Sequence, residues 1–502
     1  MSAAPAPAPA PAPASNYGKH LLRGSVWMIA ARWAMRLIGL VNTMILARLL
    51  APSDFGLIAM VMLAYGLLET ISYAGVDLAL MRGGADTREH YDTAWTVQIM
   101  QGAFITVLML ASAPAVAAYF NEPRALAVIL LVAPRALLDG MQNIGIVAFR
   151  KELDFAKEFR YTLYNRLLNF VIVIGAAIWF RNYWALVLGS LASSVIGLGL
   201  SYAMHPFRPR LSFARVRDIW SFSQWLMISR VGSYLSRKCD EFVVGGYAGT
   251  TAMGNYHVGS DLATLPSNEL VMPIRRAMFP SLSKIADKPT EFAAAVLASF
   301  SAIAAMCLFV SACLLVVAPE FVAVMLGAKW TEAVPLIRWL AMFGAFSSLV
   351  LVLEVPLWVG GKTNLSAVQT WLEFAAMVPL SWFAVHHYGV EGAAAARAGV
   401  SLAMVPIMMM LTVRAGSLGL MQLLGALARP LAAAIIMVLV VQAIPFAQLG
   451  PALVVLIAKV ALCLALYPTS VWALWVGVGR PQGFETTAMA QLGRLVAKWR
   501  PA

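Results

Sequence analysis

Residues 292–318 read FAAAVLASFSAIAAMCLFVSACLLVVA, a run without a charged side chain. About 20 mostly apolar residues in a helix cross the roughly 30 Å hydrocarbon core of a bilayer, so this run is long enough to span a membrane. Its apolar residues are continuous, whereas the strands of a membrane barrel alternate apolar and polar residues over about 10 positions. The run therefore predicts a transmembrane helix and excludes a barrel strand.

The same criterion, applied outward along the chain, predicts about fourteen transmembrane helices. The chain is 61% hydrophobic and 12% charged, whereas soluble domains average roughly a quarter charged residues. We therefore predict an all-α polytopic membrane protein. The expected spans are 26–49, 55–80, 94–120, 125–149, 161–180, 183–204, 218–247, 252–283, 292–318, 333–359, 365–386, 391–413, 425–446 and 452–478.

The lysines and arginines between the spans predict the orientation, because short cytoplasmic loops are enriched in these residues. With the N-terminus inside, the outside loops carry little more than Arg124, Arg181 and Lys329. The inside segments carry Lys19, Arg23, Arg82, Arg88, Arg150, Lys151, Lys157, Arg160, Arg208, Arg210, Arg215, Arg217, Lys284, Lys288, Lys362, Arg414, Arg480, Arg494, Lys498 and Arg500. We expect both termini in the cytoplasm, and this topological pattern accounts for the net charge of +13 without a nucleic-acid partner.

Two similar stretches predict an internal repeat. LLAPSDFGLIAM (49–60) follows the first span and GYAGTTAMGNYHV (246–258) follows the seventh, and both place a glycine, Gly56 or Gly254, at the start of the next helix. A shift of six spans keeps the direction of each helix, which is typical of transporters with parallel repeats and a substrate site between the halves. The duplication favours one chain as the transport unit.

The repeat divides the chain into five expected segments. The Pro/Ala-alternating residues 1–19 cannot form a helix or a core, so we expect an extended, disordered tail that is not a secretory signal. The other segments are a six-helix lobe (20–204), a second six-helix lobe (218–413), two extra helices (425–478) and a basic cytoplasmic tail (479–502).

Charged side chains within the spans point to the functional site, because a charge at the bilayer centre costs at least ~2.5–3.5 kcal/mol and so faces a bundle interior or an aqueous cavity. The seventh span contains RVGSYLSRKCDEFVVGGYAG (230–249), in which Arg230, Tyr234, Arg237 and Glu241 share one helical face. Arg237 and Glu241 are four residues apart and can pair, either at a substrate site or as a purely structural pair.

The first two helices of each expected lobe carry most of these charges. The basic candidates for substrate binding are Arg32, Arg36, Arg230, Arg237 and Arg275. The candidates for ion coupling, or for a polar cavity wall, are Glu69, Asp77, Asp240, Asp261 and Asn268. Such a lining would attract an anionic substrate, and its acids could carry a coupling cation. Asp261 could instead cap a helix broken by proline.

Enzyme motifs are missing from the sequence. It has no complete Gly-x-x-x-x-Gly-Lys-Ser/Thr nucleotide loop and no zinc or Ser-His-Asp spacing. The four cysteines lie in apolar runs without metal-ligand spacing. We therefore predict a protein that is not an enzyme and that needs no cofactor or metal.

Several motifs in order resemble the polysaccharide transporter (oligosaccharide flippase) family of the multidrug/oligosaccharidyl-lipid/polysaccharide exporter superfamily. They include ILARLLAPSDFGLIAM (45–60), HYDTAWTVQ (90–98), SRKCDEFVVGGYAGTTAMGNYHVGSDLATLP (236–266) and LGAKWTEAVPLIRWLA (326–341). The resemblance covers roughly residues 20–415 and implies two six-helix lobes in the inverted V of MATE transporters. The family's Arg-x-x-Asp is matched by Arg237 and Asp240, while Lys238 and Glu241 are additional charges.

The resemblance also implies a function. Such proteins flip oligosaccharide repeat units on undecaprenyl pyrophosphate across the bacterial inner membrane, by alternating access, for exopolysaccharide, capsule or lipopolysaccharide assembly. The expected partners are the lipid-linked oligosaccharide, membrane lipids, and the polymerase and glycosyltransferases of the same pathway. Guanidinium groups suit a pyrophosphate because they bind phosphate through two N–H groups at once.

The sequence is also compatible with other functions. A cation-coupled multidrug exporter or a lipid-II flippase would have the same superfamily fold. A membrane glycosyl enzyme would need more carboxylates than the outside loop 319–332 supplies. A scaffold would leave the arginines within the spans unexplained.

Overall fold

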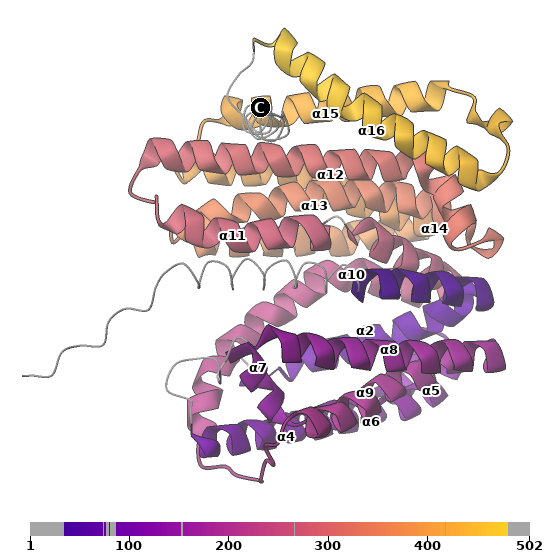
Figure 1. Cartoon of the computed structure of the whole chain (residues 1–502), viewed down its shortest axis with the longest axis vertical. Helices are drawn as coiled ribbons and strands as arrows, with labels where there is room; N and C mark the ends of the chain where they lie inside the picture. The colour runs from indigo at the N-terminus through magenta and orange to yellow at the C-terminus, as the bar shows by residue number, and fades with distance from the viewer. Residues whose placement is uncertain are drawn as a thin grey trace, which may run out of the picture.

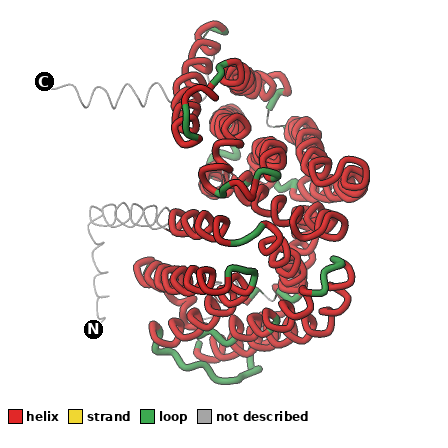
Figure 2. Tube along the Cα trace, turned by 90° about the vertical axis from the view of Figure 1, so that its right-hand side faces the viewer, coloured by secondary structure: helices red, strands yellow, loops and turns green. Residues whose placement is uncertain are grey.

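The computed structural model describes residues 35–73, 75–76, 80, 87–151, 154–265, 267–416 and 418–479. In these ranges the chain consists of helices and the loops that join them, without a strand (Figure 2). The helices form two lobes, one containing α2 and α4–α9 and the other containing α11–α16, with α10 between them (Figure 1). The predicted all-α fold with two lobes and two extra C-terminal helices is therefore confirmed.

The first lobe is built mainly from long helices that lie alongside one another (Figure 1). After a first helix at residues 35–49, its elements are α2 (Pro52–Ile71), α4 (Arg88–Tyr119), α5 (Arg124–Val132), α6 (Pro134–Gly140), η1 (Ile144–Ile146), α7 (Val147–Lys151), α8 (Phe155–Phe180) and α9 (Trp184–Met204).

The second half of the chain contains the two longest helices of the described part, α10 and α14. Its elements are α10 (Val216–Ala263), η2 (Ser267–Val271), α11 (Met272–Ser283), α12 (Pro289–Met325), η3 (Ala328–Trp330), α13 (Ala333–Val359) and α14 (Thr363–Arg414). The two extra helices, α15 (Leu420–Ala443) and α16 (Ala452–Gly477), follow with η4 (Phe446–Leu449) between them.

Two of these elements are each a pair of helices. In α10 the backbone of Gly249 has φ 79° and ψ 178°, so the chain turns there, and α10 has a first arm before Gly249 and a second arm after it. Glycine fits this turn because it lacks the Cβ that makes positive φ costly. A second break, at Gly389, divides α14 in the same way. The seventh and eighth expected spans thus begin as the two arms of α10.

Nine helices of the described part are long and apolar enough to cross a membrane: α2, α4, α8, α9, α12, α13, α14, α15 and α16. Helix α10 is not among them, because its glycine, polar and charged residues make both arms less apolar than the other spans. The expected span 55–80 is shorter than predicted, since α2 ends at Ile71. The expected span 125–149 is broken into α5, α6, η1 and α7, with Pro134, which lacks an N–H donor, at the first break.

The two glycines of the expected repeat touch each other. A Cβ on Gly56 would lie 1.7 Å from the carbonyl oxygen of Thr250, and one on Gly254 would lie 1.8 Å from that of Pro52. The contact is reciprocal: each glycine meets the carbonyl four residues before the other glycine, as a two-fold axis between similar hairpins requires. This glycine contact lets α2 and the second arm of α10 approach at backbone distance, and it supports the predicted repeat.

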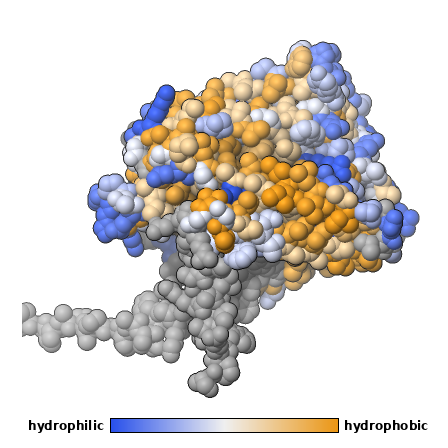
Figure 3. Space-filling model, turned by 90° about the horizontal axis from the view of Figure 1, so that it is seen from above, coloured by the Kyte–Doolittle hydropathy of each residue, from blue (hydrophilic) through white to orange (hydrophobic). Residues whose placement is uncertain are grey.

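The molecular surface has the pattern of a membrane protein. Figure 3 shows hydrophobic residues over most of one face, with hydrophilic residues gathered toward its edges. Large apolar side chains are widely exposed, among them Trp179 at 84% and Met421 at 80%. A soluble monomer rarely exposes apolar patches of this extent, so lipid is the natural environment of this surface.

The C-terminal pair of helices packs on the second lobe, where α15 contacts α12 and α16 contacts both. Lys459 of α16 lies within an apolar helix, and its Nζ is 2.7 Å from Oε1 of Glu320 on α12. Both side chains are largely buried, which explains how a charge is tolerated in this span. The exact segment boundaries, including the tails 1–19 and 479–502, remain predictions.

The loop between α4 and α5 contains a surface ion pair that gives a pH-dependent prediction. Nε and Nη2 of Arg124 each donate to one carboxylate oxygen of Glu122 at 2.8 Å, which lowers the pKa of that carboxyl group. A lowered pKa stabilises the fold above the unfolded value of about 4.3, and this contribution is lost as the pH falls through the folded value. Glu122→Gln should therefore reduce stability by at most about 1 kcal/mol at pH 7. Thermal unfolding in detergent should show the difference from wild type disappearing in acid, and an equal difference at all pH values would contradict the assignment.

Candidate functional site

The surface between the two lobes, the interlobe surface, is closed at the end that carries the glycine contact of Gly56 and Gly254. There Trp330 Nε1 donates to the carbonyl of Ala47 at 2.9 Å, and its indole meets the ring of Phe55 edge-on at 5.1 Å. Tyr119 at the end of α4 donates to the carbonyl of Phe242 in α10 at 3.2 Å. These contacts cross between the lobes and, together with the glycine contact, hold the lobes against each other at this end.

Farther along α2, away from this end, the lobes remain joined through a tyrosine. The hydroxyl of Tyr234 on α10 donates to the carbonyl of Leu63 at 2.9 Å. A Cβ on Gly66 would lie 2.7 Å from the same hydroxyl, so the small residue makes room for it. Glu69 follows on the next turn of α2 and is exposed, with Arg135 and Arg230 as its nearest positive charges.

Arg230 and Arg237 are the two basic candidates on the first arm of α10, and both are exposed. The guanidinium of Arg230 lies over the ring of Tyr73, 3.6 Å from its centroid. Neither arginine forms an ion pair with an acidic group of the described residues. Their positive charge is therefore available to a ligand, which is the geometry expected of an anion site.

Arg36 brings further positive charge to this region from the first helix. Its Nε is 3.8 Å from Oε1 of Glu269 in η2, a contact that joins the lobes. Arg166 of α8 reaches the same helix: a Cβ on Gly39 would lie 2.3 Å from its Nη2. Arg36 and Arg166 are close enough to repel each other electrostatically. Two guanidinium groups near one carboxylate leave a net positive charge.

Arg275, the fifth basic candidate, is occupied by a partner. Its Nη2 is 2.6 Å from Oε2 of Glu354 on α13, and the guanidinium lies 4.3 Å from the ring centroid of Trp358. Glu354 is buried. A buried pair of this kind is satisfied within the second lobe, so Arg275 is less available to a ligand than Arg237.

Asp240 lies in a buried network rather than on an open surface. It is 3% exposed and accepts a hydrogen bond from Arg397 Nη1 at 3.2 Å and one from the hydroxyl of Tyr256 at 2.5 Å. Arg397 also donates to the carbonyls of Ser236 and Arg237. The network joins both arms of α10 to α14, and both oxygens of Asp240 are used.

Glu241 does not pair with Arg237, contrary to the simple helical-face expectation. Its side chain is 2% exposed and forms ion pairs with Lys238 on the same arm and with Nδ1 of His257 at 3.2 Å on the second arm. The two residues of this helical face therefore have different surroundings. Arg237 is exposed, whereas Glu241 is buried against the second arm. The turn at Gly249 folds that arm back, and a sequence pattern of one helix does not show which neighbour each side of it will meet.

The side chains of three other candidates are not described. Arg32 and Asp77 lie outside the described residues, and Asn268 lies in η2 with its side chain outside the described part. Asp261 is 70% exposed, and its Oδ2 is 3.9 Å from Nε2 of His257. No group of three metal-ligating side chains occurs within the described ranges.

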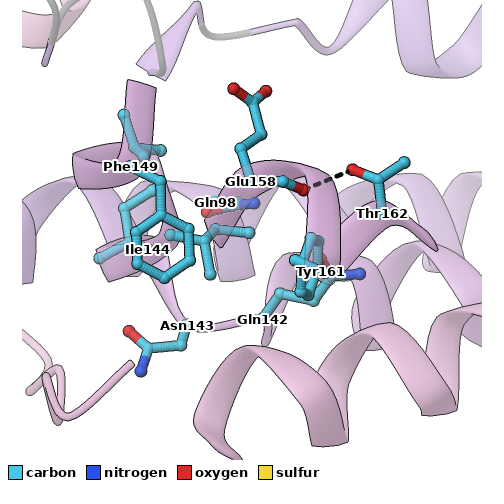
Figure 4. A pocket seen from close by; sticks show the side chains of 10 residues that line it. Gln98, Gln142, Asn143, Ile144, Phe149, Glu158, Tyr161 and Thr162 are labelled. Carbon is cyan, nitrogen blue, oxygen red and sulfur yellow. Dashed lines mark hydrogen bonds between the residues drawn. The ribbon is translucent and has the colours of Figure 1, made fainter. Parts of the chain in front are cut away.

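A separate pocket of about 180 Å³ lies within the first lobe. Its lining combines apolar side chains with polar ones, among them Gln142, Asn143, Glu158, Tyr161 and Thr162 (Figure 4). Tyr161 donates to Oε1 of Gln142 at 3.0 Å. It lacks the arginines that characterise the interlobe surface, so we place the candidate site between the lobes and not here.

The model of a family described as "Polysaccharide biosynthesis protein" matches residues 45–335, more than half of the chain. The chain belongs to this family. The family match includes Arg230, Arg237, Asp240, Asp261 and Arg275, whereas Arg397 and Glu354 lie beyond its end.

Three known proteins show the range of similarity around this family. The lipopolysaccharide biosynthesis protein WzxC of Escherichia coli (strain K12) is 23% identical over 338 residues, which are 65% of this chain and 68% of WzxC. A lipid II flippase MurJ structure in the inward closed conformation matches with a TM-score of 0.73 at 12% identity, over 90% of this chain and 99% of MurJ. An inward-facing multidrug resistance MATE family transporter of the MOP superfamily matches with a TM-score of 0.60 at 14% identity, over 76% of this chain and 94% of that protein. The expected resemblance of fold is thereby confirmed.

Two residues near the candidate site, Arg166 and Trp330, are not among the candidates that the sequence predicts. Arg166 lies in the middle of an apolar helix, so the search for charges within spans could have found it. Trp330 was not distinguished because tryptophans near span ends usually form an interfacial belt, and only the fold shows its indole reaching the first helix.

Proposed function

We propose that the chain flips lipid-linked oligosaccharide repeat units, carried on undecaprenyl pyrophosphate, from the cytoplasmic to the outer leaflet of a bacterial inner membrane by alternating access. It acts as a transporter and not as an enzyme. The observation that carries this proposal is the positive charge of Arg230, which lies against Tyr73 of the first lobe, and of Arg237 on the same arm, both exposed and without an ion pair to a described acidic residue. A pyrophosphate is a multiply charged anion that pairs well with guanidinium groups.

The orientation follows from the distribution of lysine and arginine, which supports cytoplasmic termini. In that orientation the glycine contact faces the outside, and the lobes are closed there. The ligand then enters between the lobes from the cytoplasm, with its lipid tail in the bilayer. A polymerase and glycosyltransferases of the same pathway are the expected partners, and one chain forms the transport unit.

The two alternatives, a cation-coupled multidrug exporter and a lipid-II flippase, differ from this proposal in their substrates. A cationic drug would be repelled by Arg230, Arg237 and Arg36, whereas carrier-linked sugar would be attracted. A lipid-II flippase would be essential for the cell wall. Deleting the gene should therefore leave cell-wall synthesis and drug resistance unchanged, while carrier-linked sugar accumulates in the inner leaflet of spheroplasts.

Arg237→Ala tests the anion site. Loss of a charge-assisted contact of about 1.5–3 kcal/mol should reduce polymer export about tenfold or more. The measurement is surface polysaccharide in the complemented deletion strain, normalised to the amount of protein in the membrane. Arg237→Lys should retain part of the export, because it keeps the charge but loses the planar double donor.

Arg338→Ala is the matched control for this experiment, since Arg338 is an exposed arginine on α13. It should leave export within about twofold of wild type. Normal export by Arg237→Ala at wild-type protein level would remove Arg237 from the site. Normal sugar delivery in the deletion strain, in a cell without a second flippase, would refute the proposed function itself.

A further inference from the structure

Four titratable side chains form a cluster between the two arms of α10: Lys238, Glu241, His257 and Asp261. Glu241 is buried and is held by Lys238 from its own arm and by Nδ1 of His257 from the other arm. The second ring nitrogen of His257, Nε2, faces Oδ2 of the exposed Asp261 at 3.9 Å. The cluster thus extends from a buried carboxylate to an exposed one through a single imidazole.

The arrangement fits a protonated imidazole. Both nitrogens of His257 face carboxylate oxygens, and only the imidazolium form can donate from both nitrogens. With Lys238 positive and Glu241 and Asp261 negative, the cluster has a net charge of −1 when His257 is neutral and is electrically neutral when His257 is protonated. Histidine is the side chain whose ordinary titration lies between about pH 5 and 8.

The cluster is also attached to the seal between the lobes. His257 follows Gly254 of the glycine contact by three residues, within one turn of the same helix. Glu241 precedes Gly245 by four residues, and a Cβ on Gly245 would lie 2.8 Å from the ring of Phe120 in the first lobe. The bond between Glu241 and His257 therefore ties together the two arms that close the interlobe surface.

The charged groups on the elements packed against α10 have partners other than the imidazole of His257. The groups that act on His257 electrostatically are Glu241, Asp261 and Lys238. The other charged groups near α10 engage different partners: Glu332, just before α13, accepts from Asn255, Arg397 of α14 pairs with Asp240, and Glu354 pairs with Arg275. On α2, Glu69 has Arg135 and Arg230 as its neighbouring cations, and on α14, Gln369 donates to Glu373.

We propose that His257 binds the proton that couples transport to the proton gradient. The inference rests on the proposed function and adds the coupling ion, which the sequence left open. Proton release converts the imidazolium to neutral imidazole, and the proton passes from Nε2 to water or to Asp261 at the exposed end. Glu241 then keeps Lys238 but loses its cationic partner on the second arm, which weakens the tie between the arms.

The proposal predicts that pH controls the seal even without substrate. Because the closed conformation pairs His257 with Glu241, it binds the proton more tightly than a conformation with separated arms, and acid must favour closure. Because only the thiolate reacts with maleimide, each labelling rate is divided by that of free glutathione at the same pH. On this normalised scale, cysteine placed at the seal by Thr250→Cys should react with a membrane-impermeant maleimide more slowly at pH 5.5 than at pH 8. We expect a rate difference of about fivefold or more, the lower end of typical coupling between sites.

Variants of the imidazole show whether this pH dependence belongs to His257. In right-side-out vesicles, His257→Gln in the Thr250→Cys protein should remove the pH dependence, and His257→Arg should keep labelling slow at every pH. His386→Gln is the matched control, because His386 is an exposed histidine outside the cluster, and it should behave as wild type. Protein without the added cysteine gives the background from the four native cysteines.

A normalised rate that does not change between pH 5.5 and 8 would overturn the proposal, as would a His257→Gln variant with wild-type pH dependence. A second measurement tests whether substrate binding releases the proton, with undecaprenyl pyrophosphate as the substrate probe. Its binding to purified protein in nanodiscs at pH 6 should release protons to a pH dye from wild type and His386→Gln but not from His257→Gln. If the probe fails to bind while labelling still depends on His257, the proposed substrate is wrong and the proton site stands.

Discussion

Replacing Asp240 by asparagine is expected to lower the free energy of unfolding by about 3–5 kcal/mol, because it leaves the charge of Arg397 buried without its carboxylate partner. Both side chains are nearly inaccessible, at 4% and 5% exposure. Arg397 cannot lose its proton in a protein, so it has no means of becoming neutral. The measurement is the thermal unfolding midpoint in detergent, together with the amount of protein in the membrane.

A double variant separates a structural role of Asp240 from a role in ion coupling. Asp240→Leu with Arg397→Met removes both charges and should recover most of the lost stability, as apolar replacement of buried pairs often does. Tyr256→Phe removes one hydrogen bond and should cost only about 1 kcal/mol, and Arg276→Met on the exposed side of α11 should be neutral. If Asp240→Asn were as stable as wild type but inactive in transport, the residue would belong to the coupling site instead.

Gly254→Ala is expected to reduce transport by at least about tenfold while the protein still inserts in the membrane. The new methyl group would lie 1.8 Å from the carbonyl oxygen of Pro52, and backbone atoms cannot move aside as a flexible side chain can. Close contact between α2 and the second arm of α10 is therefore lost, and the lobes cannot close at this end. Polymer export in the complemented deletion strain measures the effect.

The control for this variant is Gly399→Ala in α14, where an added Cβ meets nothing within 4 Å. Alanine is favoured over glycine inside a helix by up to about 1 kcal/mol, so this variant should be at least as stable as wild type. Gly56→Ala should reproduce the defect of Gly254→Ala, because the contact is reciprocal. Full export by either contact variant would show that the cycle does not require this approach of the lobes.

Hydropathy was sufficient to predict the fold because membrane helices must be long and continuously apolar. It failed on lengths where local chemistry ends a helix inside an apolar run, as at Pro134 and after Ile71. The repeat signal was short, yet its two glycines turned out to be partners in one contact. Glycines that allow backbones to meet across a symmetric interface leave such a signal because no larger residue can replace them.

The charged residues of the site could be predicted because they lie within apolar spans. Their interaction partners could not be predicted. Helical spacing placed Arg237 and Glu241 on one face, and the structure instead pairs Glu241 with His257 and Asp240 with Arg397. These pairs depend on the turn at Gly249 and on the packing of α14 against α10, and both lie beyond the period of a single helix. Which arginines bind substrate remains a prediction for experiment.

The distance in sequence between Asp240 and Arg397 has a consequence for biogenesis. The two partners are 157 residues apart, and a ribosome adding about 5–20 residues per second makes that length in about 8–31 s. During that interval the first arm of α10 carries a carboxylate without its final cation, and α14 later enters the membrane with a guanidinium whose ion-pair partner is Asp240. The insertion machinery must therefore keep these helices out of open lipid until they meet, and chains stalled between the two positions are the natural substrates of membrane quality control.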